Sequence, residues 1–140
     1  MVEGQVPASG ISTLVLDANI LIAYLDADDA SHAAAVGILT GHGVATFMVS
    51  ALNLAEVMVY PARAGALDAA QEALSFLDLV VASVDESSVV ALASLRSTTG
   101  LKTPDVCALC TARDASSPLA TLDRRLASVA RSIGVEVVTP

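Results

Sequence analysis

Short apolar runs alternate with helix-forming segments along almost the whole chain, and this alternation most constrains the fold. The runs are rich in Val and Leu, which is typical of strands buried on both faces. Such strands, separated by helices, predict a parallel sheet with helices on both sides. We therefore expect an α/β fold, a three-layer α/β/α sandwich around a central parallel sheet of about five strands. The expected strands are 13–16, 44–49, 79–84, 118–122 and 135–138.

Helix signals fill the segments between these strands. Ser50 can cap the helix that follows the second strand, and Pro61 should stop that helix between 61 and 65. Thr103 followed by Pro104 predicts a cap with proline at the first helical position. The expected helices are 18–25, about 31–40, 51 to about 63, 67–77, 85–97, 103–115 and 123–133.

Composition predicts one well-packed domain. The chain has 140 residues, of which 54% are hydrophobic and 16% charged, far from the composition of disordered chains. Residues 1–12 are polar and contain Gly and Pro, so we expect a flexible leader before a domain at 13–140. The longest apolar stretch, 14–25, is too short to span a membrane. With no secretory signal at the start, we expect a cytoplasmic protein without a membrane partner.

The net charge excludes one way of binding nucleic acid. Seven Lys and Arg residues stand against fifteen Asp and Glu residues, which gives a net charge of −8. A protein that binds polyanions with its general surface would carry the opposite sign. If nucleic acid is the substrate, local cations must hold it.

The two cysteines do not indicate a disulfide framework. Cys107 and Cys110 fall in a helical segment, where their spacing places them on one face. We interpret them as small core residues, since free cysteine is among the most buried residue types. A redox pair belongs nearer the start of a helix.

Three acidic residues directly follow expected strands, namely Asp17, Asp85 and Asp123. In an open parallel sheet the ligand crevice lies outside the carboxyl ends of the strands, and right-handed crossovers bring these ends to one edge. Each of the three can equally be a simple helix N-cap. Topology alone does not place Asp105, which opens a helix and can also be a first-turn acid that favours the helix dipole.

Glu56 lies on an otherwise apolar helix. A carboxylate in such a position either points to solvent or is retained, at a cost in stability, for a function. The sequence leaves both interpretations open.

Four motifs, in order and at matching spacing, resemble those of PIN-domain proteins, and the chain is most similar to the VapC-type toxins of bacterial toxin–antitoxin pairs. The resemblance covers residues 12–138, almost the whole chain. No single motif is specific, whereas the four together are. They are LVLDANIL at 14–21, NLAEV at 53–57, KTPDV at 102–106 and ATLDRRL at 120–126.

The resemblance implies an acidic quartet that binds Mg²⁺ or Mn²⁺, with two polar supports. Asp17 and Asp105 would contribute most to the principal metal, and Asp123 would join directly or through water. Glu56 would orient or deprotonate the attacking water or hold a second metal. Asp85 has no counterpart in this set, so we interpret it as a cap. The quartet is Asp17, Glu56, Asp105 and Asp123, and the supports are Asn19 and Thr121.

Four cations close in sequence to Asp105 or Asp123 are candidates for RNA binding. Arg124 and Arg125 open the last helix, where positive charge is unfavourable to the helix dipole, so one of them could have another role. Each candidate can also be an ordinary surface charge. The candidates are Lys102, Arg113, Arg124 and Arg125.

The resemblance implies a metal-dependent endoribonuclease, the toxin of a type II toxin–antitoxin system, which hydrolyses structured RNA and so restrains translation and growth. It also implies a VapB-type antitoxin whose tail places an arginine among the carboxylates, and a homodimer. The alternative is a catalytically silent PIN-like binding or regulatory module, against which the intact quartet speaks. A receiver-type domain with Asp17 as nucleophile would need an acid where Asn19 stands.

Overall fold

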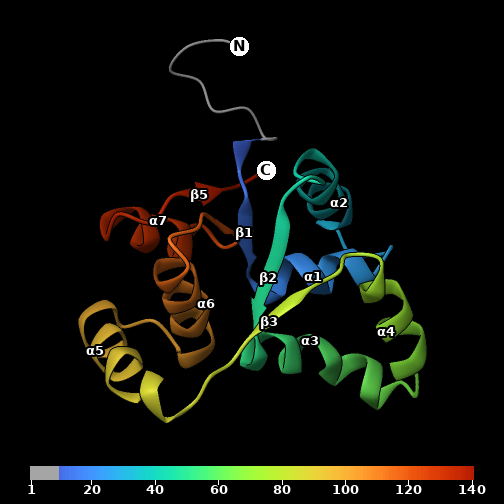
Figure 1. Ribbon diagram of the computed structural model, residues 1–140. Helices are drawn as coiled ribbons and strands as arrows, with labels where there is room; N and C mark the ends of the chain where they lie inside the picture. The colour runs from blue at the N-terminus through green and yellow to red at the C-terminus, as the bar shows by residue number, and fades with distance from the viewer. Residues whose placement is uncertain (1–9) are drawn as a thin grey trace.

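The computed structural model describes residues 10–140 and contains a central five-stranded sheet (Figure 1). The strands are β1 (Thr13–Leu16), β2 (Thr46–Ser50), β3 (Val80–Ala82), β4 (Leu119–Ala120) and β5 (Val137–Val138). Their order across the sheet is β3-β2-β1-β4-β5, and every neighbouring pair is parallel. The expected parallel sheet of five strands is confirmed.

Helices connect the strands along the described part of the chain. A short 3-10 helix, Glu86–Ser88, precedes the fifth α-helix. The α-helices are α1 (Ala18–Leu25), α2 (His32–Gly41), α3 (Ala51–Arg63), α4 (Leu67–Ser75), α5 (Val89–Thr99), α6 (Thr103–Asp114) and α7 (Arg124–Ser132).

The helices cover the sheet in two groups, α1 to α4 on one side and α5 to α7 on the other (Figure 1). Successive residues of a strand point to opposite faces. Leu14 and Leu16 accordingly pack in the core cluster formed with α1 to α4, whereas Val15 packs in the cluster formed with α5 to α7. All three side chains are fully buried. The three-layer α/β/α sandwich is therefore confirmed, with β1 at its centre.

Three strands are shorter than expected. Residues 79–84, 118–122 and 135–138 form strands only over Val80–Ala82, Leu119–Ala120 and Val137–Val138. β3 and β5 are the edge strands, each paired with one neighbour, whereas β4 lies between β1 and β5. Apolar composition thus predicted these strands but overestimated their length.

Most helix boundaries agree with the sequence. The helix expected at 85–97 differs, because Glu86–Ser88 form a 3-10 helix and α5 begins only at Val89. Ser50 caps α3 by accepting a hydrogen bond from the Asn53 N–H, and α3 continues through Pro61 to end at Arg63. The expected cap at Thr103 is wrong, because Lys102 is the N-cap residue of α6. The hydroxyl of Thr103 instead accepts a hydrogen bond from Arg96 at 2.7 Å.

The expected flexible leader, 1–12, falls mostly on residues 1–9, which lie outside the described residues. Within the described part, Ile11 packs against the core beside β1 and the Ser12 carbonyl accepts a hydrogen bond from the Thr46 N–H at 2.9 Å. None of the helices between residues 10 and 140 has the length and apolar character needed to cross a membrane.

Candidate functional site

The centre of the candidate site is Asp17, at the carboxyl end of the central strand. Its backbone N–H bonds to the Ala120 carbonyl at 2.9 Å, so the ends of β1 and β4 lie side by side. The residue is only 4% exposed. One carboxylate oxygen accepts from the Ala18 N–H and the other from the Thr121 hydroxyl, both at 2.8 Å. Asp17 is therefore the N-cap of α1, but its second oxygen is held across the sheet edge.

Thr121 connects Asp17 to Asn19 and Asp123. Its hydroxyl oxygen accepts hydrogen bonds from the Asn19 side-chain amide at 3.3 Å and from the Asp123 N–H at 3.0 Å. The single hydroxyl proton is thereby directed to Asp17. The side-chain oxygen of Asn19 accepts a hydrogen bond from the Leu122 N–H at 3.2 Å, which closes the network. Asn19 and Thr121 thus lie where polar supports for Asp17 are needed.

Asp123 begins α7. One of its carboxylate oxygens accepts from the backbone N–H groups of Arg125 and Leu126, at 2.9 and 3.2 Å. The other oxygen accepts no hydrogen bond from residues 10–140. Asp123 therefore combines a helix cap with a free carboxylate oxygen at the edge of the sheet.

Asp105 lies in the first turn of α6 and is electrostatically coupled to the other two aspartates. Burial raises the pKa of Asp17 from 3.8 to about 6; the hydrogen bond from Thr121 opposes this rise, and the charges of Asp105 and Asp123 add to it. The pKa of Asp105 is raised by burial and by Asp123, against the opposing charges of Lys102 and Arg125. The three aspartates form one region of concentrated negative charge.

Glu56 stands at the margin of this group. It is exposed on α3, and it does not contribute to the raised pKa values of Asp17 and Asp105. Its charge instead helps to raise the pKa of the Cys107 thiol, two residues past Asp105 in α6, although burial is the main cause. The structure therefore brings three of the four expected acids together and places the fourth beside them.

Asn53, a fully buried residue to which the sequence assigned no role, ties Glu56 to the start of α6. Its side-chain NH₂ donates to the Pro104 carbonyl at 3.0 Å and, at 3.5 Å, to a carboxylate oxygen of Glu56. Its side-chain oxygen accepts from the Ser50 hydroxyl at 2.5 Å. The signal in the sequence was an amide in the first turn of a largely apolar helix.

Replacing this amide tests its contribution. Asn53→Leu keeps the approximate volume but leaves the Ser50 hydroxyl and the Pro104 carbonyl without their partner. We expect a loss of about 2–4 kcal/mol in the free energy of unfolding, because buried polar groups without a partner are costly. Urea denaturation measures it. Gln71→Leu on the exposed face of α4 is the control, and a loss below about 1 kcal/mol in Asn53→Leu would contradict the assignment.

The candidate cations lie in two places. Lys102 and Arg125 are close enough to Asp105 to lower its pKa, and the Arg125 guanidinium lies 3.5 Å from where a Cβ on Gly100 would be. Arg124 is exposed, next to Asp123. These three cations lie at or beside the candidate site.

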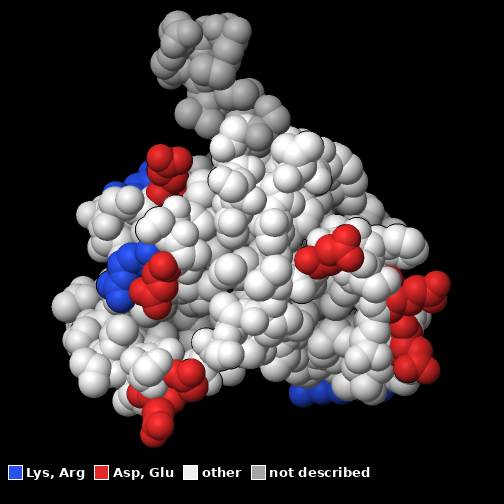
Figure 2. Space-filling view, in the orientation of Figure 1, with Lys and Arg blue, Asp and Glu red and all other residues white. Residues whose placement is uncertain are grey.

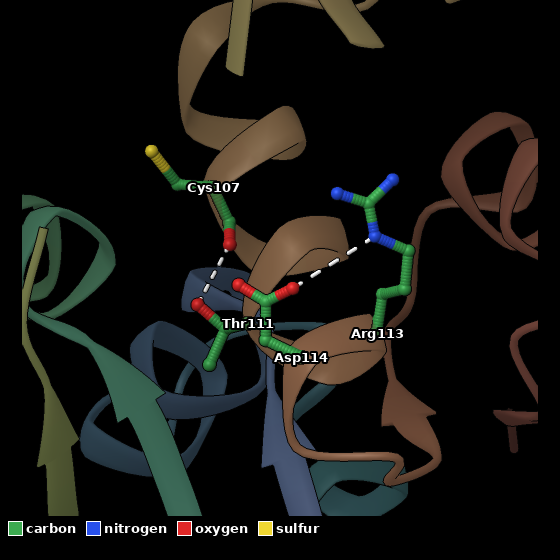
Figure 3. Close-up of polar contacts among 4 residues, drawn as sticks. All are labelled: Cys107, Thr111, Arg113 and Asp114. Atoms are coloured by element: carbon green, nitrogen blue, oxygen red, sulfur yellow. Dashed lines mark hydrogen bonds and ion pairs between the residues drawn. The ribbon is translucent and has the colours of Figure 1, made fainter. Parts of the chain in front are cut away.

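Arg113 lies elsewhere. It follows Asp105 by eight residues, about 12 Å along α6, and its guanidinium pairs with Asp114 at 3.9 Å (Figure 3). It lines a pocket with Ser117 and Pro118, which precede β4 at the amino edge of the sheet. The structure therefore places this RNA-binding candidate far from the carboxylates.

A family model for the PIN domain matches residues 14–132, which is most of the chain. The chain belongs to the PIN-domain family. No curated protein sequence matches it.

Solved structures support the fold of this PIN domain. A toxin–antitoxin complex from Klebsiella pneumoniae is 25% identical, with a TM-score of 0.70 over 91% of this chain and 97% of that one. VapC20 from Mycobacterium tuberculosis, a toxin that cleaves the sarcin-ricin loop, is 18% identical, with a TM-score of 0.72 over 91% and 99%. VapBC2 from Rickettsia felis, bound to promoter DNA, is 15% identical, with a TM-score of 0.66 over 90% and 97%.

The aspartates of this PIN domain fit an open site for a hard divalent cation. Across residues 10–140, no group of three or more His, Cys, Asp or Glu side chains is arranged so that it could hold a metal ion by itself. Mg²⁺ does not need one, because it uses one or two carboxylates together with waters and substrate phosphate. Asp17 supplies a buried carboxylate destabilised by Asp105 and Asp123, which a cation would relieve. Donors of this kind suit Mg²⁺ or Mn²⁺ rather than a thiolate-bound metal.

The remaining titratable residues of the PIN domain that the sequence singled out have structural roles. Asp85 is exposed and caps the short 3-10 helix by accepting from the Ser87 N–H and hydroxyl, which lower its pKa. Its interpretation as a cap is confirmed. Cys107 and Cys110 are buried free thiols in α6, and burial raises the pKa of both. Their interpretation as core residues is also confirmed.

Proposed function

We propose that this PIN-domain protein is a metal-dependent endoribonuclease that acts in the cytoplasm as the toxin of a type II toxin–antitoxin pair. The observation that carries the proposal is the buried Asp17 carboxylate, held by Thr121 and adjoined by Asp105 and Asp123. The toxin–antitoxin complexes and the ribosomal-RNA-cleaving toxin among its structural neighbours support it.

The proposed reaction is hydrolysis of a phosphodiester bond in structured RNA. Bound Mg²⁺ or Mn²⁺ supplies positive charge for the scissile phosphate and for the leaving 3′ oxygen, and lowers the pKa of a water. Asp17 and Asp105 hold the cation, with Asp123 contributing directly or through a water. Thr121 keeps the Asp17 carboxylate in place. Glu56, which is anchored by Asn53, orients the attacking water and accepts its proton.

We propose a VapB-type antitoxin as the partner of this chain. A cavity of about 540 Å³ lies between α1, α3 and α4, with Ile22, Tyr60 and Pro61 in its wall and the carboxylates of Asp26 and Glu56 at its edge. Its apolar wall and acidic edge fit a basic amphipathic segment. An arginine on that segment, reaching past Glu56 toward the aspartates, would inhibit the site.

We also propose a homodimer. Apolar residues of α1 and α3 form one candidate contact surface, of which Ile22 and Tyr60 are exposed whereas Tyr24 and Leu25 are partly buried. Figure 2 shows a second candidate surface, an uncharged area around β3 with acidic residues at its margins. Exposed apolar residues along this segment include Val80 and Val81. Light scattering of the purified protein measures the mass in solution.

Induced expression in a bacterial host tests the proposed function. We expect wild-type protein to stop growth and Asp105→Asn to permit it, because this variant loses a metal ligand. Asp85→Asn is the matched control, since Asp85 is an aspartate that only caps a helix, and it should stop growth like the wild type. Growth arrest by all three proteins, or by none, would contradict a toxic activity that depends on this site and would favour the silent binding module.

A further inference from the structure

A groove runs from the catalytic edge along α7. It has a volume of about 490 Å³, and its lining includes Ser31 before α2, Thr121 and Leu122 after β4, Arg124 and Arg131 on α7, and Thr139 after β5. Thr121 is also the residue that donates to Asp17. Leu122 and Arg124 are the chain neighbours of Asp123, so the groove lies next to one of the three aspartates.

The groove is positively charged in an acidic protein. Arg124 and Arg131 are seven residues apart, two turns of helix, so both extend from the same side of α7 about 10 Å apart along its axis. Within residues 10–140 neither forms an ion pair, and no Asp or Glu lines the groove. The chain as a whole carries a net charge of −8 and repels polyanions, whereas these two free guanidinium groups would attract them locally.

The first turn of α7 directs its two arginines differently. Arg124 lines the groove, whereas Arg125 lies by Gly100 and acts on Asp105 together with Lys102. The cations thus flank the three aspartates, with Lys102 and Arg125 toward α6 and with Arg124 and Arg131 along α7. A nucleic-acid strand that crosses the aspartates would meet cations before and after the reacting phosphate.

We infer that the groove along α7 binds backbone phosphates of the RNA on one side of the scissile bond, through Arg124 and Arg131. This inference rests on the proposed ribonuclease function. Arginine presents a planar set of donors that matches phosphate oxygens. The spacing of the two side chains suits contacts with different phosphates of one strand. Arg131 was not among the RNA-binding candidates from the sequence, and it is the groove that places it in line with Arg124.

Binding of a fluorescently labelled single-stranded RNA in a chelating buffer, measured by anisotropy at several salt concentrations, tests the inference without cleavage. We expect Arg124→Gln and Arg131→Gln each to weaken binding about 3- to 10-fold at low salt. Each should also reduce the slope of log K against log salt by about 0.7, as expected for one lost phosphate contact on a single strand. Arg131→Lys should retain most of the binding, since it keeps the charge. Arg113→Gln, at the amino edge, is the matched control and should bind like the wild type.

Equal binding by Arg131→Gln and Arg113→Gln, with both folded by circular dichroism, would overturn the inference. So would a loss that is not restored by Arg131→Lys. Acidic polyglutamate that competes as well as RNA would point to an acidic protein as the ligand of the groove and also overturn it. If the protein cleaves RNA but Arg124→Gln and Arg131→Gln bind RNA like the wild type, the groove inference is wrong and the proposed function stands. If both variants bind RNA more weakly but the wild-type protein cleaves no RNA, the proposed function is wrong and the groove still binds RNA.

Discussion

Asp17→Asn is expected to lower RNA cleavage by about 100-fold or more and, at the same time, to stabilise the protein above pH 6. Cleavage falls because a neutral amide is a poorer ligand for a hard cation than a carboxylate. Stability rises because the charged carboxylate is buried at 4% exposure beside Asp105 and Asp123. At a residue that served only as a helix cap, the same substitution would change stability little, because Asn caps a helix about as well as Asp.

The sign of the stability change follows from the raised pKa. Below pH 3.8 Asp17 is protonated in both the folded and unfolded states, and it costs nothing. Between 3.8 and about 6 the unfolded chain loses the proton before the folded protein does, so stability falls as pH rises. Above pH 6 the full cost, about 3 kcal/mol, is present. The Asp17→Asn variant would avoid this cost but would lose part of the hydrogen bond from Thr121. We therefore expect the free energy of unfolding to rise by about 1–2 kcal/mol.

Urea denaturation at pH 4 and pH 8 measures this difference. We expect Asp17→Asn to be more stable than the wild type at pH 8 and equal or less stable at pH 4. Asp85→Asn is the control, because the pKa of Asp85 is lowered by Ser87, so this variant should lose stability at pH 8. Unchanged or lower stability of Asp17→Asn at pH 8 would contradict the burial cost and leave Asp17 as an ordinary cap.

Millimolar Mg²⁺ or Mn²⁺ should stabilise the wild-type protein at pH 8. A cation bound only to the folded state, at ten times its Kd, adds about 1.4 kcal/mol to the free energy of unfolding. For a domain of this size we expect the melting temperature to rise by about 5 °C. The effect should be weaker at pH 5, where protonation of Asp17 competes with the metal. Differential scanning calorimetry measures both shifts.

The same measurement distinguishes the site from general ionic effects. Asp17→Asn and Asp105→Asn should lose the metal-dependent shift, whereas Asp85→Asn should keep it. Electron paramagnetic resonance of Mn²⁺ counts the bound ions directly in each variant. Equal shifts in wild type and Asp17→Asn, or no bound Mn²⁺ in the wild type at millimolar concentration, would contradict the assignment of the metal site.

The sheet and the position of Asp17 were predictable because they depend on patterns that are local in sequence. Val and Leu runs identify the strands, and the rule that parallel strands end at one edge places Asp17 near Asp123. The resemblance added Thr121 and Asn19: the Asn19 amide donates to Thr121, and the Thr121 hydroxyl donates to Asp17. The lengths of the outer strands were not predictable, since they depend on which backbone groups find a partner.

Other features of the site depend on contacts between distant segments. Asn53 and Pro104 meet although they are 51 residues apart, and no local pattern indicates that contact. Arg113 was a candidate because it is near Asp105 in sequence, but a helix places residues eight apart at opposite ends. Arg131 follows Asp123 by the same eight residues and was not a candidate; it is the groove that connects it to Arg124 and Leu122 beside Asp123.

Cleavage of a total small-RNA pool by the purified protein tests the central claim most directly. The reaction is run with Mg²⁺, Mn²⁺ or chelator, beside Asp17→Asn, Asp105→Asn and the control Asp85→Asn. We predict discrete products that need the metal, are absent with the first two variants and are present with the third. The same products from wild type and from both site variants, or no products with either metal, would contradict a metal-dependent ribonuclease site built on these aspartates.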